Sequence, residues 1–171
     1  MTDIDRRTLL GSLAVAGGAL AAGTARAAPP MLQFTDLKKE ADVACAYHCD
    51  FGDNARFGTL LGNISNHYSS YGGTSFDVQI VIVAHGQGVK FFMENLDGSP
   101  WKDDAEALKH FERLESIAKS GLKVMLCNIT FERLKLDREK ARKADFIVMV
   151  PSGVATVAAL QSKGFGYIKV G

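Results

Sequence analysis

The chain has little of what marks several specialised classes of protein. It holds three cysteines among 171 residues, too few for a small fold stapled by disulfides. Its 20 basic and 19 acidic residues nearly cancel, so its charge gives no reason to expect a nucleic-acid partner. Internal repeats and the Walker, zincin, nucleophile-elbow and kinase motifs are all missing. What remains is an ordinary globular domain whose function must be argued from individual residues.

One apolar segment stands out near the start of the chain. Arg6 and Arg7 precede a charge-free run over residues 8–25, and the sequence Ala-Arg-Ala follows at 25–27. A basic start, a short apolar core and a small-x-small cleavage site are typical of a secretory signal. Paired arginines point to the twin-arginine route, which exports folded proteins; an uncleaved anchor and an ordinary secretory signal are the alternatives. We therefore expect residues 1–27 to be removed and the protein to be periplasmic.

Residues 28–171 have the size of one domain and can bury a core without disulfides. The signal segment carries the whole formal charge of +1, so this domain is neutral. It contains no second apolar run near the length of about 18 residues that a membrane helix needs, and we expect no membrane contact after cleavage. All three cysteines lie in it, and an odd number leaves at least one thiol unpaired within the chain.

Hydrophobic patterning predicts strands alternating with helices. The nearly continuous β-branched run over 78–83 is typical of a strand covered on both faces of a parallel sheet. We expect strands at 43–49, 76–84, 122–127, 146–150 and 166–170, and helices between 53 and 72, 89 and 96, 99 and 121, 130 and 136, and 152 and 163. Ser99 and Ser152 are placed to cap two of these helices. The alternation predicts an α/β fold with a parallel sheet.

Four positions fall where predicted strands end, at the edge where ligands gather in such sheets. They hold Cys49, His85, Cys127 and Ser152. Cys127 is the candidate catalytic residue, because it directly precedes a helix start whose partial positive charge favours the thiolate. The alternative for both cysteines is a small buried hydrophobic side chain. If Cys49 and Cys127 lie on adjacent strands, they form a candidate redox pair.

The segment His-Gly-Gln-Gly at 85–88 is a second candidate feature. Its glycines leave backbone amides bare near a helix start, which suits a small anion. Phe91 stands where a dinucleotide-binding loop needs glycine or alanine, which argues against a nucleotide site. The ligand-binding candidates at this edge are His85, Gly86, Gly88, Asn128 and Ser152.

Four side chains of the domain are of the types that bind zinc or copper. They are His48, Cys49, His85 and Cys127. Their spacing matches no metal-binding motif. The sequence therefore predicts no metal centre and no cofactor.

Four segments, in order along the chain, resemble the DsrE/DsrF-like family of small α/β proteins linked to sulfur trafficking. They are AHGQGV at 84–89, VMLCN at 124–128, VPSGV at 150–154 and LQSKGFGYI at 160–168. The resemblance implies a three-layer α/β/α fold with a five-stranded, mainly parallel sheet, and assembly into trimers or hexamers. It also implies that Cys127 stands where relay members often place the cysteine that carries sulfur as a persulfide.

On these grounds we expect an exported sulfur carrier or sulfurtransferase. Cys127 would take sulfur from a donor and pass it to the thiol of an acceptor protein. One alternative is a periplasmic oligomer that binds a small ligand or a metal ion without turnover. Another is a structural subunit in which Cys127 is inert. Thiol reactivity distinguishes the sulfur carrier from the structural subunit, and metal analysis of the purified protein distinguishes the sulfur carrier from the binding protein.

Overall fold

The computed structural model describes residues 28–73 and 77–171 of the chain. Within them, five strands form one sheet in the order β4-β3-β2-β1-β5, and every neighbouring pair is parallel. The strands are β1 (Val43–Cys49), β2 (Val78–Ala84), β3 (Lys123–Cys127), β4 (Ile147–Val150) and β5 (Gly166–Lys169). The expected α/β class and five-stranded parallel sheet are confirmed.

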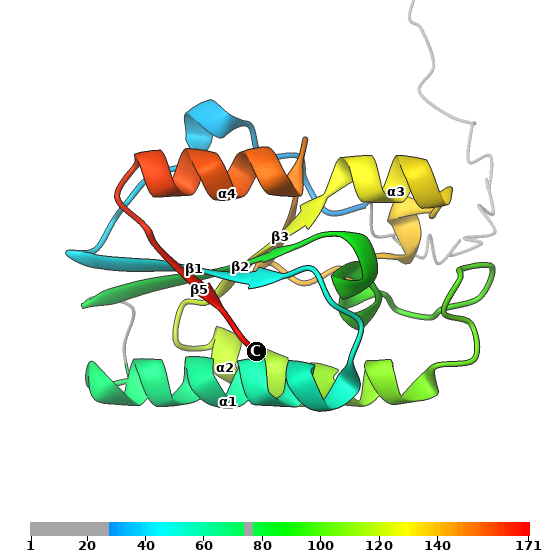
Figure 1. Ribbon diagram of the computed structural model, residues 1–171, viewed down its shortest axis with the longest axis horizontal. Helices are drawn as coiled ribbons and strands as arrows, with labels where there is room; N and C mark the ends of the chain where they lie inside the picture. The colour runs from blue at the N-terminus through cyan, green and yellow to red at the C-terminus, as the bar shows by residue number, and fades with distance from the viewer. Residues whose placement is uncertain (1–27, 74–76) are drawn as a thin grey trace, which may run out of the picture.

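Helices cover both faces of this sheet (Figure 1). The helices α1 (Asn54–Ser70) and α2 (Phe111–Ala118) lie on one face, and α3 (Asn128–Leu134) and α4 (Gly153–Ser162) lie on the other. Each face has its own apolar core, because successive side chains of a strand point to opposite faces. The larger core lies against α1 and α2, and the smaller one lies beneath α4. The expected three-layer α/β/α arrangement is therefore confirmed.

Local signals place the ends of the helices. Asp53 caps α1 by accepting a hydrogen bond from the backbone N–H of Arg56 at 2.6 Å. Gly72, just after α1, has a φ of 76°, which favours glycine. Ser152 caps α4 through a hydrogen bond from the helix backbone, and Gly164 follows its end with a φ of 88°. These boundaries agree with the sequence predictions.

The prediction of a helix from Ser99 to Gly121 is wrong over the first half of that range. A 3-10 helix, η3 (Ala105–His110), precedes α2, which begins only at Phe111. The Ser99 hydroxyl does not cap a helix, because it donates to a carbonyl of its own loop at 2.7 Å and accepts from the backbone N–H of Trp101 at 3.1 Å. These bonds close a local turn in place of the predicted helix start.

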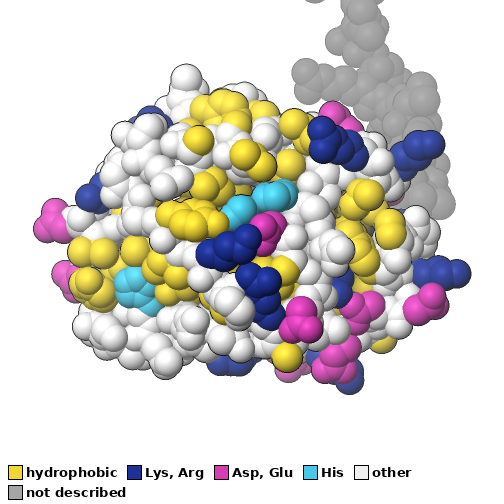
Figure 2. All heavy atoms as spheres, in the orientation of Figure 1, with side chains coloured by type: hydrophobic (Ala, Val, Ile, Leu, Met, Phe, Trp, Pro, Cys, Tyr) yellow, Lys and Arg dark blue, Asp and Glu magenta, His cyan; other side chains and the backbone are white. Residues whose placement is uncertain are grey.

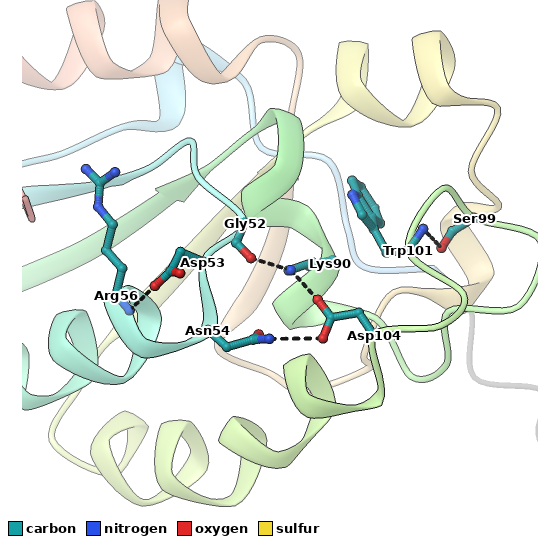
Figure 3. Close-up of polar contacts among 8 residues, drawn as sticks. All are labelled: Gly52, Asp53, Asn54, Arg56, Lys90, Ser99, Trp101 and Asp104. Atoms are coloured by element: carbon teal, nitrogen blue, oxygen red, sulfur yellow. Dashed lines mark hydrogen bonds and ion pairs between the residues drawn. The ribbon is translucent and has the colours of Figure 1, made fainter.

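The helix expected over 89–96 is instead a 3-10 helix, η2 (Gly86–Phe92). It carries Lys90 into the interior, where its ammonium group binds the carbonyl oxygen of Gly52 and the carboxylate of Asp104 (Figure 3). Among the described residues, Lys90 is the only charged residue that is buried. Lys90 therefore connects the loop after β1 to the segment before α2 and holds the chain in place behind the carboxyl ends of the strands.

The interpretation of residues 1–27 as an export signal lies outside the described residues, as does the predicted start of the second strand at Phe76. Within the described ranges, no helix is both long enough and apolar enough to cross a membrane.

Candidate functional site

The carboxyl ends of β1, β2 and β3 bring polar side chains to one edge of the sheet. The parallel register aligns the three strand ends, so that Asp50, His85 and Cys127 follow one another across the edge. Val83, two residues before His85, and Met125, two residues before Cys127, belong to the core beneath α4. By the same alternation His48, Asp50, His85 and Cys127 all lie on the α4 face of the sheet.

An open cavity of about 400 Å³ lies beside Cys127. Four of the sequence-predicted site residues line it, namely His85, Gly86, Cys127 and Ser152. The Cys127 side chain is only 4% exposed, so the cavity is the route by which a small molecule can reach its thiol. Arg133 lines the same cavity and forms no ion pair with any residue that the structure describes. The cavity therefore combines a thiol with an uncompensated positive charge.

Gly153, the first residue of α4, allows the helix to approach this edge closely. A β-carbon at Gly153 would lie 2.8 Å from Cβ of His85 and 3.1 Å from Cβ of Cys127. Both distances are well below the ordinary contact of about 3.5–4.0 Å between carbon atoms. The Gly153 backbone thus packs directly against both side chains and holds them at the same helix start.

His48 and His85 form a direct imidazole pair next to Cys127. Their Nε2 atoms are 2.6 Å apart, and Nδ1 of His48 lies 2.8 Å from the hydroxyl oxygen of Tyr167 on β5. Beside the pair, Lys169 donates to a carboxylate oxygen of Asp50 at 2.9 Å. Figure 2 shows histidine side chains next to an acidic and a basic side chain on this face, with hydrophobic side chains around them.

The electrostatics of this group follow from partial burial and from two charges. Burial lowers the pKa of both His48 and His85, and the positive charge of Lys169 acts in the same direction, while Asp50 opposes it. Burial alone would raise the pKa of Asp50, but the hydrogen bond from Lys169 and the nearby charges bring it below its ordinary value. At neutral pH the site therefore holds two neutral imidazoles and an ionised carboxylate.

The glycine amides do not form the anion site expected from the sequence. The N–H of Gly86 donates to Oγ1 of Thr130 at 2.9 Å, and the N–H of Gly88 donates to the carbonyl oxygen of His85 at 3.1 Å. Both donors are used within the fold, so neither is free to hold an anion. Gly86 still lines the cavity, whereas Gly88 is buried.

Asn128 is engaged elsewhere as well. Its side chain donates to Glu132 at 2.9 Å and accepts from Arg138 at 2.6 Å, and it is not part of the cavity wall. The wall instead includes Thr130 and Arg133 of α3. Thr130 lies three residues after Cys127, and Arg133 lies three residues after Thr130. Residues three apart share a helix face, so this spacing is the sequence signal that could have identified both.

The prediction of Cys49 as a redox partner of Cys127 is wrong. Strand β2 separates β1 from β3, so the two cysteines are two strand spacings apart, about 9–10 Å. Cys49 also belongs to the core against α1 and α2, on the opposite face from Cys127. A disulfide needs Cα atoms within about 7 Å, and all three cysteines are free. Burial raises the pKa of both Cys45 and Cys49, which makes those thiols poor nucleophiles.

Comparisons with known proteins agree with this architecture. The profile of the DsrE/DsrF-like family matches residues 53–170. Among solved structures, the protein of unknown function MTH1491 from Methanobacterium thermoautotrophicum is similar, with a TM-score of 0.60 and 21% sequence identity over 75% of this chain and 99% of that chain. An identity this low shows a shared fold alone. Among curated proteins the comparison finds no match.

Proposed function

Because the chain belongs to the DsrE/DsrF-like family, we propose that it is a sulfane-sulfur carrier in which Cys127 holds the sulfur as a persulfide. The observation that carries this proposal is the position of Cys127 in the wall of an open cavity, together with His85 and Arg133. The other two thiols, of Cys45 and Cys49, lie in the core on the far side of the sheet. Cys127 is therefore the cysteine that a donor can reach.

The transfer is a thiol exchange at sulfur. The Cys127 thiolate attacks the outer sulfur of a donor persulfide; a sulfur–sulfur bond forms at Sγ, the donor's own sulfur–sulfur bond breaks, and the donor leaves as a thiolate with the electron pair. The thiolate of an acceptor protein then takes the same sulfur and restores Cys127. No net oxidation occurs. His85 and the Arg133 guanidinium line the cavity where the anionic sulfur species would bind.

Intact-mass measurement of the purified protein after mixing with polysulfide tests this function. The wild type is expected to gain mass in steps of one sulfur atom, and Cys127→Ser is expected to lose nearly all of this gain. Cys45→Ser is the matched control, because Cys45 is buried in the other core and should not contribute to loading. Circular dichroism checks that both variants are folded.

Two outcomes would contradict the carrier function. Equal loading of the wild type and Cys127→Ser would show that another group takes up the sulfur. No loading of the wild type would leave the binding-protein alternative, in which the cavity holds a small ligand without turnover, as the better account.

The proposal also places the protein in the periplasm, supported by Arg6-Arg7 and the Ala-Arg-Ala sequence at 25–27. Replacing Arg6 and Arg7 by lysine is expected to hold the precursor in the cytoplasm, as seen by cell fractionation. Arg26→Lys leaves the pair intact and should be exported, with a mature amino terminus at Ala28. Normal export of the double variant would rule out the twin-arginine route.

Assembly into a closed homo-oligomer of three or six chains is part of the same proposal. Its support is that Ile129 and Val154, which line the Cys127 cavity, are 37% and 65% exposed, as expected where apolar side chains meet a partner. Light scattering at micromolar concentration should give a multiple of the chain mass, and Val154→Asp should reduce it. A monomeric wild type would remove the assembly from the proposal.

A further inference from the structure

Three metal-binding side chains meet at the sheet edge next to Cys127. One ring nitrogen of His48, one ring nitrogen of His85 and a carboxylate oxygen of Asp50 all lie within 4.8 Å of one another, and the Nε2 atoms of the two histidines face each other at 2.6 Å. His48 and Asp50 come from the end of β1, and His85 follows the neighbouring strand β2. The strand order reverses at β1, because β2, β3 and β4 follow on one side of it and β5 lies on the other. Ligands in open parallel sheets gather at such a reversal. We infer that His48, His85 and Asp50 form a binding site for a divalent transition metal, zinc above all.

The donor set fits zinc. Two imidazole nitrogens and one carboxylate oxygen are common zinc ligands, and three protein ligands leave a fourth position open to water or to a small ligand. The absence of a thiolate among the three and the mixture of nitrogen and oxygen also suit other late divalent ions such as cobalt. No sequence motif indicates the site, because His48 and His85 lie far apart in the sequence and are brought together by the pairing of β1 with β2.

The hydrogen bonds around the histidines prepare them as ligands. Tyr167 contacts Nδ1 of His48 at 2.8 Å, and an imidazole whose Nδ1 is engaged in this way presents Nε2 to a metal. A metal ion bound to both Nε2 atoms would take the place of the hydrogen bond that now joins them across 2.6 Å.

The two imidazoles need only a small movement to admit the ion. Tetrahedral zinc with bonds of about 2.0–2.1 Å to nitrogen holds its two nitrogen ligands a little over 3 Å apart, so the Nε2 atoms of His48 and His85 must separate by less than about 1 Å. Both side chains are partly exposed, and rotation of the rings supplies this separation without moving the strands.

Lys169 is the local competitor for the metal. Its ammonium group binds Asp50 at 2.9 Å, so it occupies one carboxylate oxygen and adds a positive charge beside the ion. The Lys169 side chain is 46% exposed, which allows it to swing into water when a metal binds. Its removal should therefore strengthen metal binding, a result opposite to that expected of a residue that merely supports the fold.

Calorimetric titration of the untagged chain with zinc sulfate tests the site, and the visible spectrum of the cobalt-loaded protein reports the ligand geometry. The wild type is expected to bind one ion per chain. His48→Ala and Asp50→Ala should each weaken binding by at least about tenfold, and Lys169→Met should tighten it several-fold. His67→Gln, which changes a histidine of α1 outside the site, should bind zinc as the wild type does.

Cys127→Ser separates this inference from the proposed function. That variant is expected to lose sulfur loading and to keep its zinc, because Cys127 is not among the three ligands; loss of zinc with the thiol would overturn the assignment. Absence of zinc binding by the wild type at millimolar metal would overturn it, as would unchanged affinity in a folded His48→Ala. If His48→Ala does not fold, Lys169→Met decides, and an affinity equal to or weaker than that of the wild type would overturn the site.

Discussion

Gly88→Ala is expected to lower the free energy of unfolding by about 3 kcal/mol or more. A β-carbon at Gly88 would lie 2.1 Å from the carbonyl oxygen of Cys49 and 2.8 Å from its Sγ. That oxygen also accepts a hydrogen bond from the N–H of His85 at 3.1 Å, so the end of β1 cannot move away without breaking a contact of the site. The melting temperature, followed by circular dichroism, should fall by roughly 10 °C.

Gly58→Ala is the matched control for this substitution. Gly58 lies within α1, and the nearest side-chain atom to an added β-carbon, Cε1 of His110, would be an ordinary 3.6 Å away. Alanine in a helix interior is favoured over glycine by up to about 1 kcal/mol, so this variant should melt at or above the temperature of the wild type. An unchanged melting temperature for Gly88→Ala would contradict the close packing of η2 against the end of β1.

Much of the fold can be predicted from the sequence, because the signals for its strands and helix caps lie within a few residues of the elements that they specify. The β-branched run of β2 and the capping residues Asp53 and Ser152 each act within a few residues of themselves. The structure between β2 and α2 does not follow from local sequence, because Lys90 in this region binds Asp104, 14 residues later, and Gly52, 38 residues earlier in the chain. Such contacts override helical spacing and leave no periodic signal.

The candidate site divides in the same way. Cys127, His85 and Ser152 are predictable, because each follows a recognisable strand and the ends of parallel strands share one edge. Which face of the sheet each β1 side chain occupies cannot be predicted. This strand is buried on both sides, so its apolar pattern does not alternate in a way that would distinguish the two faces. Because the pattern does not distinguish the two faces of β1, the sequence cannot show that Cys49 faces away from Cys127 or that His48 shares a face with His85.

Lys90→Met is expected to reduce the free energy of unfolding by about 2–3 kcal/mol at neutral pH. Methionine fills similar space but leaves the carboxylate of Asp104 with Asn54 as its remaining side-chain donor, at 3.0 Å, and removes the donor to Gly52. Lys109→Met is the control, because Lys109 pairs with Glu106 on the surface, where the two side chains are 70% and 54% exposed. Such a pair contributes little, so urea unfolding of this variant should match the wild type.

The loss in Lys90→Met should also depend on pH. The hydrogen bonds from Lys90 and Asn54 hold the pKa of Asp104 below its ordinary value. Ionised Asp104 therefore stabilises the fold above the pKa of an unfolded aspartate, about 4, and this contribution is lost as the pH falls through the lower pKa of the folded state. The difference between wild type and Lys90→Met should be largest near neutral pH and should shrink below about pH 4. Because the bond to Gly52 and the packing of the side chain do not titrate, an equal difference in urea unfolding at neutral and acid pH would assign the whole effect to them and contradict the role of the buried ion pair.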